Sequence, residues 1–519
     1  MRRGRDPGGG RADARARGGR LGVWIAAILA PWWLGCNALL GIDEHGLGAG
    51  AEVGADGGRD NPLGPPGCVR GTPSTDVDFF NQCTSSQYLV FDNCARLGLC
   101  QGEIPPLFDP VPGGSAGPPS AGPATPPTVG CYNATTRNKL VFMQGSTNFT
   151  PFIQAMAPLV ARNGYTIVWQ STSSCAGAGA GGFDTRLGKN LMTNPVSPAQ
   201  TYAGFYDETG ARTPCLLGNS PTSPDGASEI TDIGQSDVFA KGCPLPAGES
   251  EWTPGSPPYL DIGHYLGPIQ SMVFVVPPQS SQRVISAEAA RMVFGMGGGQ
   301  GTASPWIDAM HLYIRGPTTG TNNILSRAID VPNDRWWGID MQTAAAMQTA
   351  ILSTSATDAE ATIGTLSIDY ADKLKDTLHI LSFQARGQVA GFLPDSGPNA
   401  FDKKNVRDGH YSPWGPIHLY SKLSGGQASA QAAAFVVPFT IPNQALIDAT
   451  IAGGTVPVCA MHVSRDQEMG PLKTFQPAFA CDCYYDFKVS NGNKCTRCTG
   501  PADCPPTAPA CNLGYCELD

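Results

Sequence analysis

Four short segments rich in glycine, serine and threonine recur along the chain, and they constrain its fold more than any other feature. Two of them directly precede a run with helical spacing. Turns of this composition before a helix can close backbone N–H groups around an oxyanion. Each turn alone is ordinary, so the prediction rests on their number and order. The segments span residues 145–148, 173–177, 234–237 and 315–321.

The pattern around these segments predicts an α/β fold. Residues 140–143 form a short apolar strand that runs into the first segment. Thr150 can cap a following helix, with Pro151 in its first turn, and residues 165–169 alternate as a second strand. This order is typical of a parallel sheet.

The same order returns farther along the chain, so we expect two similar α/β lobes with a binding site between them. Ser286 can cap the first helix of this second region. The expected helices are 287–294, 322–329 and 341–352, and the expected strands are 271–276, 311–314, 364–368 and 377–383.

The N-terminus predicts export. Seven arginines in the first 20 residues precede an apolar run at 21–34 that is short for a membrane span. The run ends in Trp-Leu-Gly-Cys, which is similar to a bacterial lipobox with Cys36 as the lipidated residue. Cleaved secretion and an uncleaved anchor are the alternatives. We therefore expect a lipid anchor in the cell envelope, on the periplasmic side or the outer surface.

Cysteines gather toward both ends of the chain. Of the 17 cysteines, sixteen remain without Cys36, and an even number in an exported protein predicts up to eight disulfides. Seven fall in the last 39 residues. A zinc site is the alternative for four of them, although export and the three further cysteines favour disulfides. These four are Cys481, Cys483, Cys495 and Cys498.

Composition divides the chain into five parts. Gly, Ala, Asp and Pro dominate the second part, which is typical of a flexible tether. The predicted parts are a signal peptide (1–36), the tether (37–66), a Cys-rich segment (67–135), a two-lobed domain (136–455) and a Cys-rich module (456–519).

Charge and motifs exclude several classes of function. A net charge of −9 disfavours a broad contact with nucleic acid. The sequence has no His-x-x-x-His spacing, no Gly-x-Ser-x-Gly turn and no Walker-type loop. We therefore expect no metal, no cofactor and no enzymatic activity.

Asp237 and Arg315 are the charged residues of the four segments. A carboxylate repels an anion unless the ligand brings a proton that the carboxylate can accept. Asp237 therefore favours protonated phosphate or arsenate over sulfate. Arg315, at the end of a predicted strand, supplies a planar set of N–H donors.

The order of the four segments resembles that of the periplasmic phosphate-binding proteins of ABC transporters, in the type 2 periplasmic binding protein superfamily. Their first loop is a Gly-Ser-Ser-Thr-like turn before a proline, as at 145–151, and their second is Gly-Ser-Gly-x-Gly, similar to 173–177. Their third ends in Gly, a residue and Ser-Asp, as at 233–237, and their fourth is Arg-x-Asp-x-Ser-Gly-Thr, similar to 315–321. The resemblance covers residues 138–450.

The resemblance implies a two-lobed periplasmic-binding-protein fold with a hinge and an interlobe cleft, to which the cysteines add small disulfide-rich terminal modules. It implies a solute-binding protein for ABC-type uptake or sensing, with phosphate or a similar oxyanion as ligand and a transporter permease as candidate partner. The implied ligand-binding residues are Ser146, Thr147, Asn148, Ser174, Ser236, Asp237, Arg315, Thr319, Gly320 and Thr321.

Two departures from the family pattern keep an alternative open. Pro317 stands where the family has an Asp that pairs with the arginine, and Cys175 replaces a glycine. Cys175 could crowd the loop or tie it through a disulfide. Pro317 and the Cys-rich ends favour a surface adhesion or interaction protein that keeps the fold and has lost its ligand. A phosphatase-like hydrolase is disfavoured, because the sequence offers no nucleophile or metal cluster.

Overall fold

The computed structural model describes most of one compact unit, which spans residues 60–519. The predicted signal peptide, with Cys36, lies outside the described residues. The described ranges are 64–102, 106–107, 125–178, 191–195, 200–218, 227–243, 260–296, 303–440, 443–490 and 495–518.

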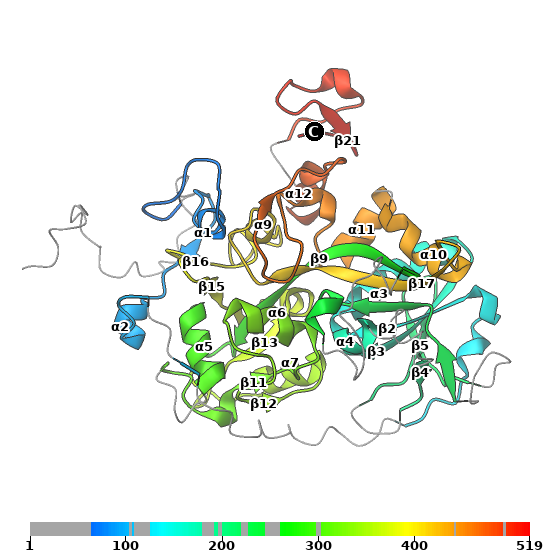
Figure 1. Cartoon of the computed structure of the whole chain (residues 1–519), viewed down its shortest axis with the longest axis horizontal. Helices are drawn as coiled ribbons and strands as arrows, with labels where there is room; N and C mark the ends of the chain where they lie inside the picture. Colours follow the sequence, from blue (N-terminus) through cyan, green and yellow to red (C-terminus); the bar gives the residue numbers. More distant parts are fainter. Residues whose placement is uncertain are drawn as a thin grey trace, which may run out of the picture. The chain divides into compact units, whose positions relative to one another are not determined.

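A ten-stranded sheet runs through the unit, and its centre is a long antiparallel pair, β9 (Ile262–Val276) and β17 (Trp414–Ser424) (Figure 1). Its other strands are β2 (Leu140–Ser146), β3 (Thr166–Thr172), β5 (Gly204–Tyr206), β6 (Arg212–Pro214), β8 (Ile233–Ser236), β13 (Gly364–Ser367), β14 (His379–Ile380) and β18 (Gln427–Ala428).

The order along this sheet is β13-β9-β17-β8-β2-β3-β5-β6, with β14 beside β9 and β18 beside β17. β2 runs parallel to both β3 and β8, which agrees with the parallel unit expected from the first strand, helix and strand. β9 and β17 are antiparallel to each other and connect this parallel part to the rest of the sheet.

The smaller sheets each have two to four strands. β10 (Val284–Ser286), β15 (Ser382–Gln384), β16 (Gly391–Phe392) and β1 (Tyr88–Leu89) form one of them, and β11 (Tyr313–Ile314) pairs in parallel with β12 (Ile339–Asp340). The remaining pairs are β4 (Leu191–Thr193) with β7 (Ser228–Ile230), β19 (Val463–Ser464) with β20 (Lys473–Thr474), and β21 (Ala510–Asn512) with β22 (Tyr515–Glu517).

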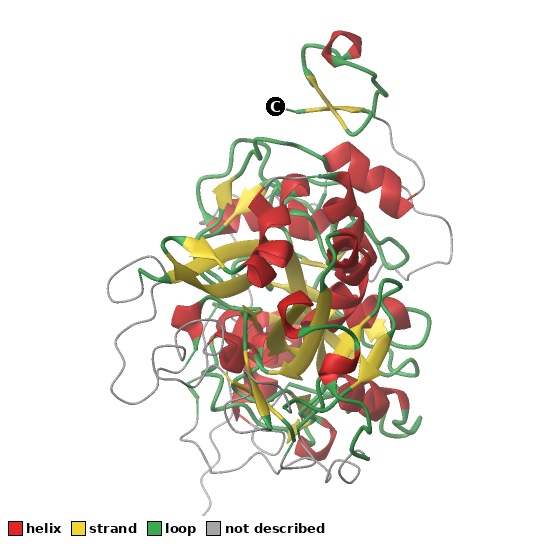
Figure 2. Ribbon diagram, turned by 90° about the vertical axis from the view of Figure 1, so that its right-hand side faces the viewer, coloured by secondary structure: helices red, strands yellow, loops and turns green. Residues whose placement is uncertain are grey.

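Twelve α-helices lie in the described part of the chain, drawn in red in Figure 2 among the yellow strands. They are α1 (Asp76–Phe80), α2 (Asn93–Leu97), α3 (Thr150–Arg162), α4 (Ser174–Ala178), α5 (Ala287–Met296), α6 (Gly320–Ala328), α7 (Ala344–Leu352), α8 (Ile368–Ala371), α9 (Lys404–Arg407), α10 (Ala430–Val436), α11 (Gln444–Ala452) and α12 (Asp482–Ser490).

Three predicted helix starts differ from the structure. α7 begins at Ala344 and not at residue 341, because the side chain of Thr343 caps it. Ser286 does cap α5, because its Oγ accepts a hydrogen bond from Ala289 N at 3.0 Å. Thr150 is not a cap: it is the first residue of α3, and its hydroxyl accepts from Trp169 Nε1 at 3.1 Å. α6 begins two residues before the predicted start, because the side chain of Thr319 caps it.

Two lobes with separate hydrophobic cores make up the α/β body. The first lobe, formed by β2, β3, β5, β6, β8, α3, α10 and α11, buries Phe149, Phe152 and Trp169. The second lobe, formed by β11 to β13 and α5 to α8, buries Phe294 and Trp336 in a larger cluster. β9 and β17 contribute side chains to both cores. The predicted mixed α/β class is confirmed.

Eight cysteine pairs lie at disulfide distance, which confirms the predicted disulfide-rich ends. The four cysteines considered for zinc all belong to disulfides. Sulfurs of two of these disulfides lie near one another, because those of Cys498, Cys504 and Cys516 are all within 4.8 Å of one another. The pairs are Cys68–Cys83, Cys94–Cys100, Cys131–Cys215, Cys175–Cys243, Cys459–Cys481, Cys483–Cys495, Cys498–Cys511 and Cys504–Cys516.

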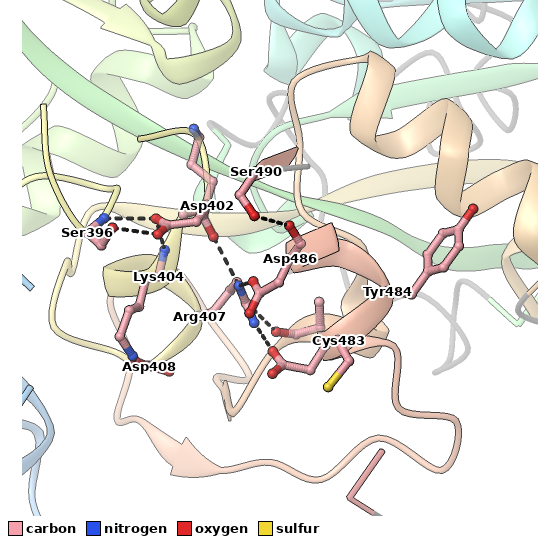
Figure 3. A network of polar contacts seen from close by, with 12 residues as sticks. Ser396, Asp402, Lys404, Arg407, Asp408, Cys483, Tyr484, Asp486 and Ser490 are labelled. Atoms are coloured by element: carbon pink, nitrogen blue, oxygen red, sulfur yellow. Dashed lines mark hydrogen bonds and ion pairs between the residues drawn. The ribbon is translucent and has the colours of Figure 1, made fainter. Parts of the chain in front are cut away.

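A buried arginine joins the α/β body to the C-terminal helix α12 (Figure 3). Arg407 Nη1 donates to Asp486 Oδ1 at 2.6 Å and to Asp402 O at 3.1 Å, while Nη2 contacts Asp482. Its Nε donates to Ala460 O at 2.9 Å. Arg407 is buried, whereas Asp482 and Asp486 are about one third exposed, so this one cation connects α12 with α9.

No single helix in the described ranges has both the length and the hydropathy for a membrane span. One bent pair, Ala430–Thr440 with Gln444–Ala452, meets the length and composition when its two parts are counted together.

Candidate oxyanion site

The four predicted segments follow the ends of four strands, β2, β3, β8 and β11. β2 and β3 pair in parallel register, with Ser146 opposite Thr172, and β8 runs parallel to β2 on its other side. Parallel neighbours present their carboxyl ends at one edge of a sheet, so three of the turns come together there. The fourth turn follows β11 and belongs to the second lobe.

Asp237 lies at the meeting point of these segments. Its Oδ1 accepts a hydrogen bond from Gln235 Nε2 at 2.8 Å, and its Oδ2 accepts one from Asn148 Nδ2 at 3.0 Å. Its backbone N–H donates to Ser174 Oγ at 3.3 Å. Asn148 Nδ2 also donates to Thr321 Oγ1 at 2.9 Å. Residues from each of the four segments are therefore joined in one network, and Arg315 is not part of it.

Arg315 enters the same region through Thr147. The residue is 2% exposed, and its Nη2 donates to Thr147 Oγ1 and to Gln342 O, each at 3.2 Å. Among the residues that the structure describes, no acceptor bonds to Arg315 Nε or Nη1. Burial lowers the pKa of Arg315, while the charges of Asp340, Tyr370 and Asp237 oppose the change. The guanidinium stays protonated in proteins, so a buried cation keeps two N–H groups for an acceptor.

The buried donors of Arg315 are costly without a partner. An unpaired buried polar group loses its hydration and costs about 1–3 kcal/mol, more for a charged group. An anion that accepts from Nε or Nη1, close to the segments of the first lobe, would reduce that cost through charge-assisted hydrogen bonds.

Burial raises the pKa of Asp237, whereas hydrogen bonds from neighbouring side chains oppose the rise. A carboxyl group with a raised pKa shares a proton more readily with a ligand than an exposed one does. The opposing side chains are Ser146, Gln235, Asn148 and Ser174.

The amino end of α6 packs directly on Asp237. A Cβ at Gly320 would lie 2.3 Å from Asp237 Cβ, so only glycine fits there. Thr319 Oγ1 accepts from Asn322 N at 3.4 Å and donates to Gly316 O at 2.8 Å. α6 is nine residues long, and its first turn brings the partial positive charge of a helix N-terminus to the site.

The second segment is held by close packing and by a disulfide. A Cβ at Gly177 would come within 1.7 Å of Gln235 O, and one at Gly145 within 2.3 Å of the same atom. Cys175 bonds to Cys243, and its N–H donates to Thr318 O at 3.3 Å. Cys175 therefore ties the turn in place, one of the two outcomes that its replacement of glycine left open.

Three of the ten predicted residues use their hydroxyls in bonds to backbone groups nearby in the chain. Ser146 Oγ accepts from Asn148 N at 3.3 Å. Ser236 Oγ accepts from Val238 N at 3.2 Å, and Thr319 caps α6. Ser146, Thr147, Asn148, Ser174, Asp237, Arg315, Gly320 and Thr321 lie in the contacts described above. A ligand-binding role for all ten stays a prediction.

Four residues outside the predicted set also hold the site. Gln235 Oε1 accepts from Ser146 N at 2.8 Å, so its amide joins that turn to Asp237. Gln270 on β9 and Tyr370 in the second lobe donate to the loop of the first segment, and Asp369 accepts from Gln270. A glutamine inside an otherwise apolar strand was the sequence signal for Gln270.

Comparisons with known proteins give structural likeness alone. No protein-family model matches the sequence, and no curated protein matches it. A protein assigned as a phosphate ABC transporter substrate-binding protein, from Clostridium perfringens and with bound phosphate, is 12% identical. The match covers 62% of this chain and 99% of that chain, with a TM-score of 0.39.

Two further solved structures give similar figures. An ABC-type phosphate transport receptor from Vibrio cholerae is 12% identical over 61% of this chain and 99% of that one, with a TM-score of 0.36. An ancestral soluble variant of the human phosphate binding protein is 15% identical over 61% and 90%, with a TM-score of 0.39. With TM-scores below 0.5 the backbones overlap only in part, and we draw no function from them.

Proposed function

We propose that this protein is an exported solute-binding protein that holds an inorganic oxyanion, phosphate in first place, between its two α/β lobes. The observation that supports the proposal most is Arg315. Its buried guanidinium has two N–H groups without an acceptor among the described residues, at the point where Thr147 and Asp237 of the first lobe meet it. An anion there would satisfy these donors and link the lobes.

Asp237 supports phosphate over sulfate. Its carboxylate is buried beside the proposed ligand position, so a fully deprotonated anion would be repelled at close range. Phosphate and arsenate carry a proton near neutral pH that the carboxylate can accept, and sulfate carries none. We expect the protein to bind and release its ligand unchanged, in ABC-type uptake or sensing, with a lipid anchor at Cys36.

A second candidate function is adhesion or interaction at the cell surface by a fold that no longer binds a ligand. One observation favours it: both carboxylate oxygens of Asp237 already accept hydrogen bonds from amide groups of this chain. Polar groups satisfied in this way need no ligand. Arg315 argues against this candidate, because Nε and Nη1 of its guanidinium group have no hydrogen-bond acceptor among the described residues.

Calorimetric titration with inorganic phosphate separates the two candidates. We expect the native protein to release heat with micromolar affinity, and Arg315→Gln to bind about 100-fold more weakly or not at all, because charge-assisted hydrogen bonds are lost. Arg386→Gln is the matched control, since the Arg386 side chain is 47% exposed and distant in sequence from the site. Silence of the native protein with phosphate would support the adhesion candidate, and equal binding by both variants would place the anion elsewhere.

A further inference from the structure

The loop of the first segment is held from outside at two carbonyl oxygens. Tyr370 OH donates to Thr147 O at 3.2 Å, and Gln270 Nε2 donates to Asn148 O at 3.2 Å. Because a peptide group is planar, fixing its oxygen also fixes the direction of its N–H. These two bonds therefore fix the peptide groups after Thr147 and Asn148, in the loop that carries the Asn148 side chain of the proposed oxyanion site.

Asp369 holds Gln270 in this position. Gln270 Nε2 donates to Asp369 Oδ1 at 2.8 Å as well as to Asn148 O, so both amide protons are used. If the side-chain amide of Gln270 turned over by about 180°, its oxygen would take the place of its nitrogen. Neither bond could then form, because an amide has both of its donors on the nitrogen. The carboxyl group of Asp369 thus acts on the loop through Gln270.

Asp369 is nearly enclosed. It is 1% exposed, lies on α8 directly after β13, and faces Gly454, where a Cβ would come within 2.9 Å of Asp369 Cβ. Within the described ranges its Oδ2 has no hydrogen-bond partner. The residue lines a cavity of about 330 Å³, on whose wall Lys373, Lys403 and Tyr485 also lie.

Several charged or titratable groups face Asp369. Burial raises the pKa of Asp369 to about 7, with opposing effects from Ser367 and Lys373 and a further rise from the charge of Asp237. A carboxyl group at this pKa exchanges its proton near neutral pH. The facing groups are Lys373 and Asp372 from the segment after α8, Tyr370 on α8, Asp237 from the first lobe, Lys403 beside α9 and Tyr485 on α12.

We propose that Asp369 is a positioning residue of the oxyanion site, that it acts on the Asn148 loop through Gln270, and that the loss of its proton weakens anion binding. This inference rests on the proposed function. The neutral carboxyl adds no charge beside the ligand, whereas the carboxylate adds a negative charge to a buried network that already contains Asp237. Anion affinity should therefore fall as pH rises through about 7.

The test compares phosphate affinity of the native protein with that of Asp369→Asn between about pH 6 and pH 8.5, the range over which the group titrates. The ionisation of phosphate is the same for both proteins and cancels in the ratio of their Kd values. Asn keeps a carbonyl oxygen for Gln270 and removes the proton. We expect similar Kd values near pH 6 and a native protein about five- to tenfold weaker near pH 8.5, for a shift of about one pKa unit on binding.

The positioning role has its own measurement. Asp369→Ala removes the acceptor of Gln270, so we expect weaker phosphate binding at every pH. Gln270→Met should weaken binding by a similar factor, and the double variant should lose no more than Gln270→Met alone, because both changes break one chain of contacts. Asp376→Asn, an exposed carboxylate near α8, is the control and should match the native protein.

Each result decides the inference. A ratio of Kd values that stays constant with pH, or additive losses in the double variant, would overturn it while leaving the proposed function intact. A native protein that binds no phosphate at any pH would overturn the proposed function and this inference together. Thermal unfolding of each variant shows whether it is folded. The pH comparison with Asp369→Asn and the single variant Gln270→Met apply even where Asp369→Ala does not fold.

Discussion

At the scale of single residues, Asp237 sets the chemistry of the site. It is 1% exposed and accepts hydrogen bonds from Gln235 and Asn148, which orient its carboxylate without cancelling its charge. In the function that we propose, this buried negative charge near the donors of Arg315 and α6 would discriminate among anions by their protons. Selectivity, and not affinity alone, should therefore depend on this residue.

Asp237→Asn tests that selectivity. The uncharged amide oxygen is a weaker acceptor for the ligand's proton than a carboxylate, and the change removes the repulsion of a fully deprotonated anion. We expect phosphate to bind about 10- to 100-fold more weakly and the preference for phosphate over sulfate to shrink toward equality. Calorimetry with each anion measures both effects. Retention of the native preference would show that Asp237 does not contact the ligand.

At the scale of secondary-structure elements, the sequence predicted the first strand, helix and strand well. β2 and α3 have strong apolar periodicity, and their positions follow from it. Only the second part of β9 was predicted, because Gly267, Pro268 and Gln270 interrupt the apolar pattern before residue 271. β8 has four residues and forms through pairing with β2 and β17, which local sequence does not encode.

The candidate site also combines features that the local sequence predicts with features that it does not. Glycine and hydroxyl residues placed after strands are local signals, and they identified the turns around Asp237. The bonds from Gln270 and Tyr370 join residues more than 100 positions away from the turn they hold, so no local pattern could predict them. The Cys175–Cys243 pairing could not be chosen among many combinations from sequence alone.

α6 gives the prediction that belongs to this scale. Gly320 has no room for a Cβ because Asp237 lies against it. We expect Gly320→Ala to displace Asp237, to weaken phosphate binding strongly and to lower stability by about 1–3 kcal/mol, the usual cost of overpacking. Gly71→Ala is the matched control, because a Cβ added at Gly71 would have no atom within 4 Å. It should leave phosphate binding and stability unchanged. Denaturant unfolding and calorimetry measure the two effects, and native-like binding by Gly320→Ala would contradict the packing argument.

At the scale of the whole molecule, covalent and ionic links hold the Cys-rich regions on the α/β body. Cys131–Cys215 connects the segment before β2 with the strands beyond β5, and Arg407 fixes α12. β9 and β17 contribute to the cores of both lobes. Four polar residues meet between the lobes: Asp237 and Asn148 come from one, and Arg315 and Thr321 come from the other. Their positions thus depend on the folding of the complete unit.

The central claim is that turns from both lobes enclose one tetrahedral anion at Arg315. Crystals grown with arsenate, a phosphate analogue with a strong anomalous signal, test it directly. We expect one anomalous peak, from arsenic, beside Asp237 and Arg315, with an arsenate oxygen within about 3.2 Å of Arg315 Nε or Nη1, the distance of a hydrogen bond. A well-ordered site without a peak there, or a peak bound elsewhere while Arg315 keeps its donors unpaired, would contradict the account.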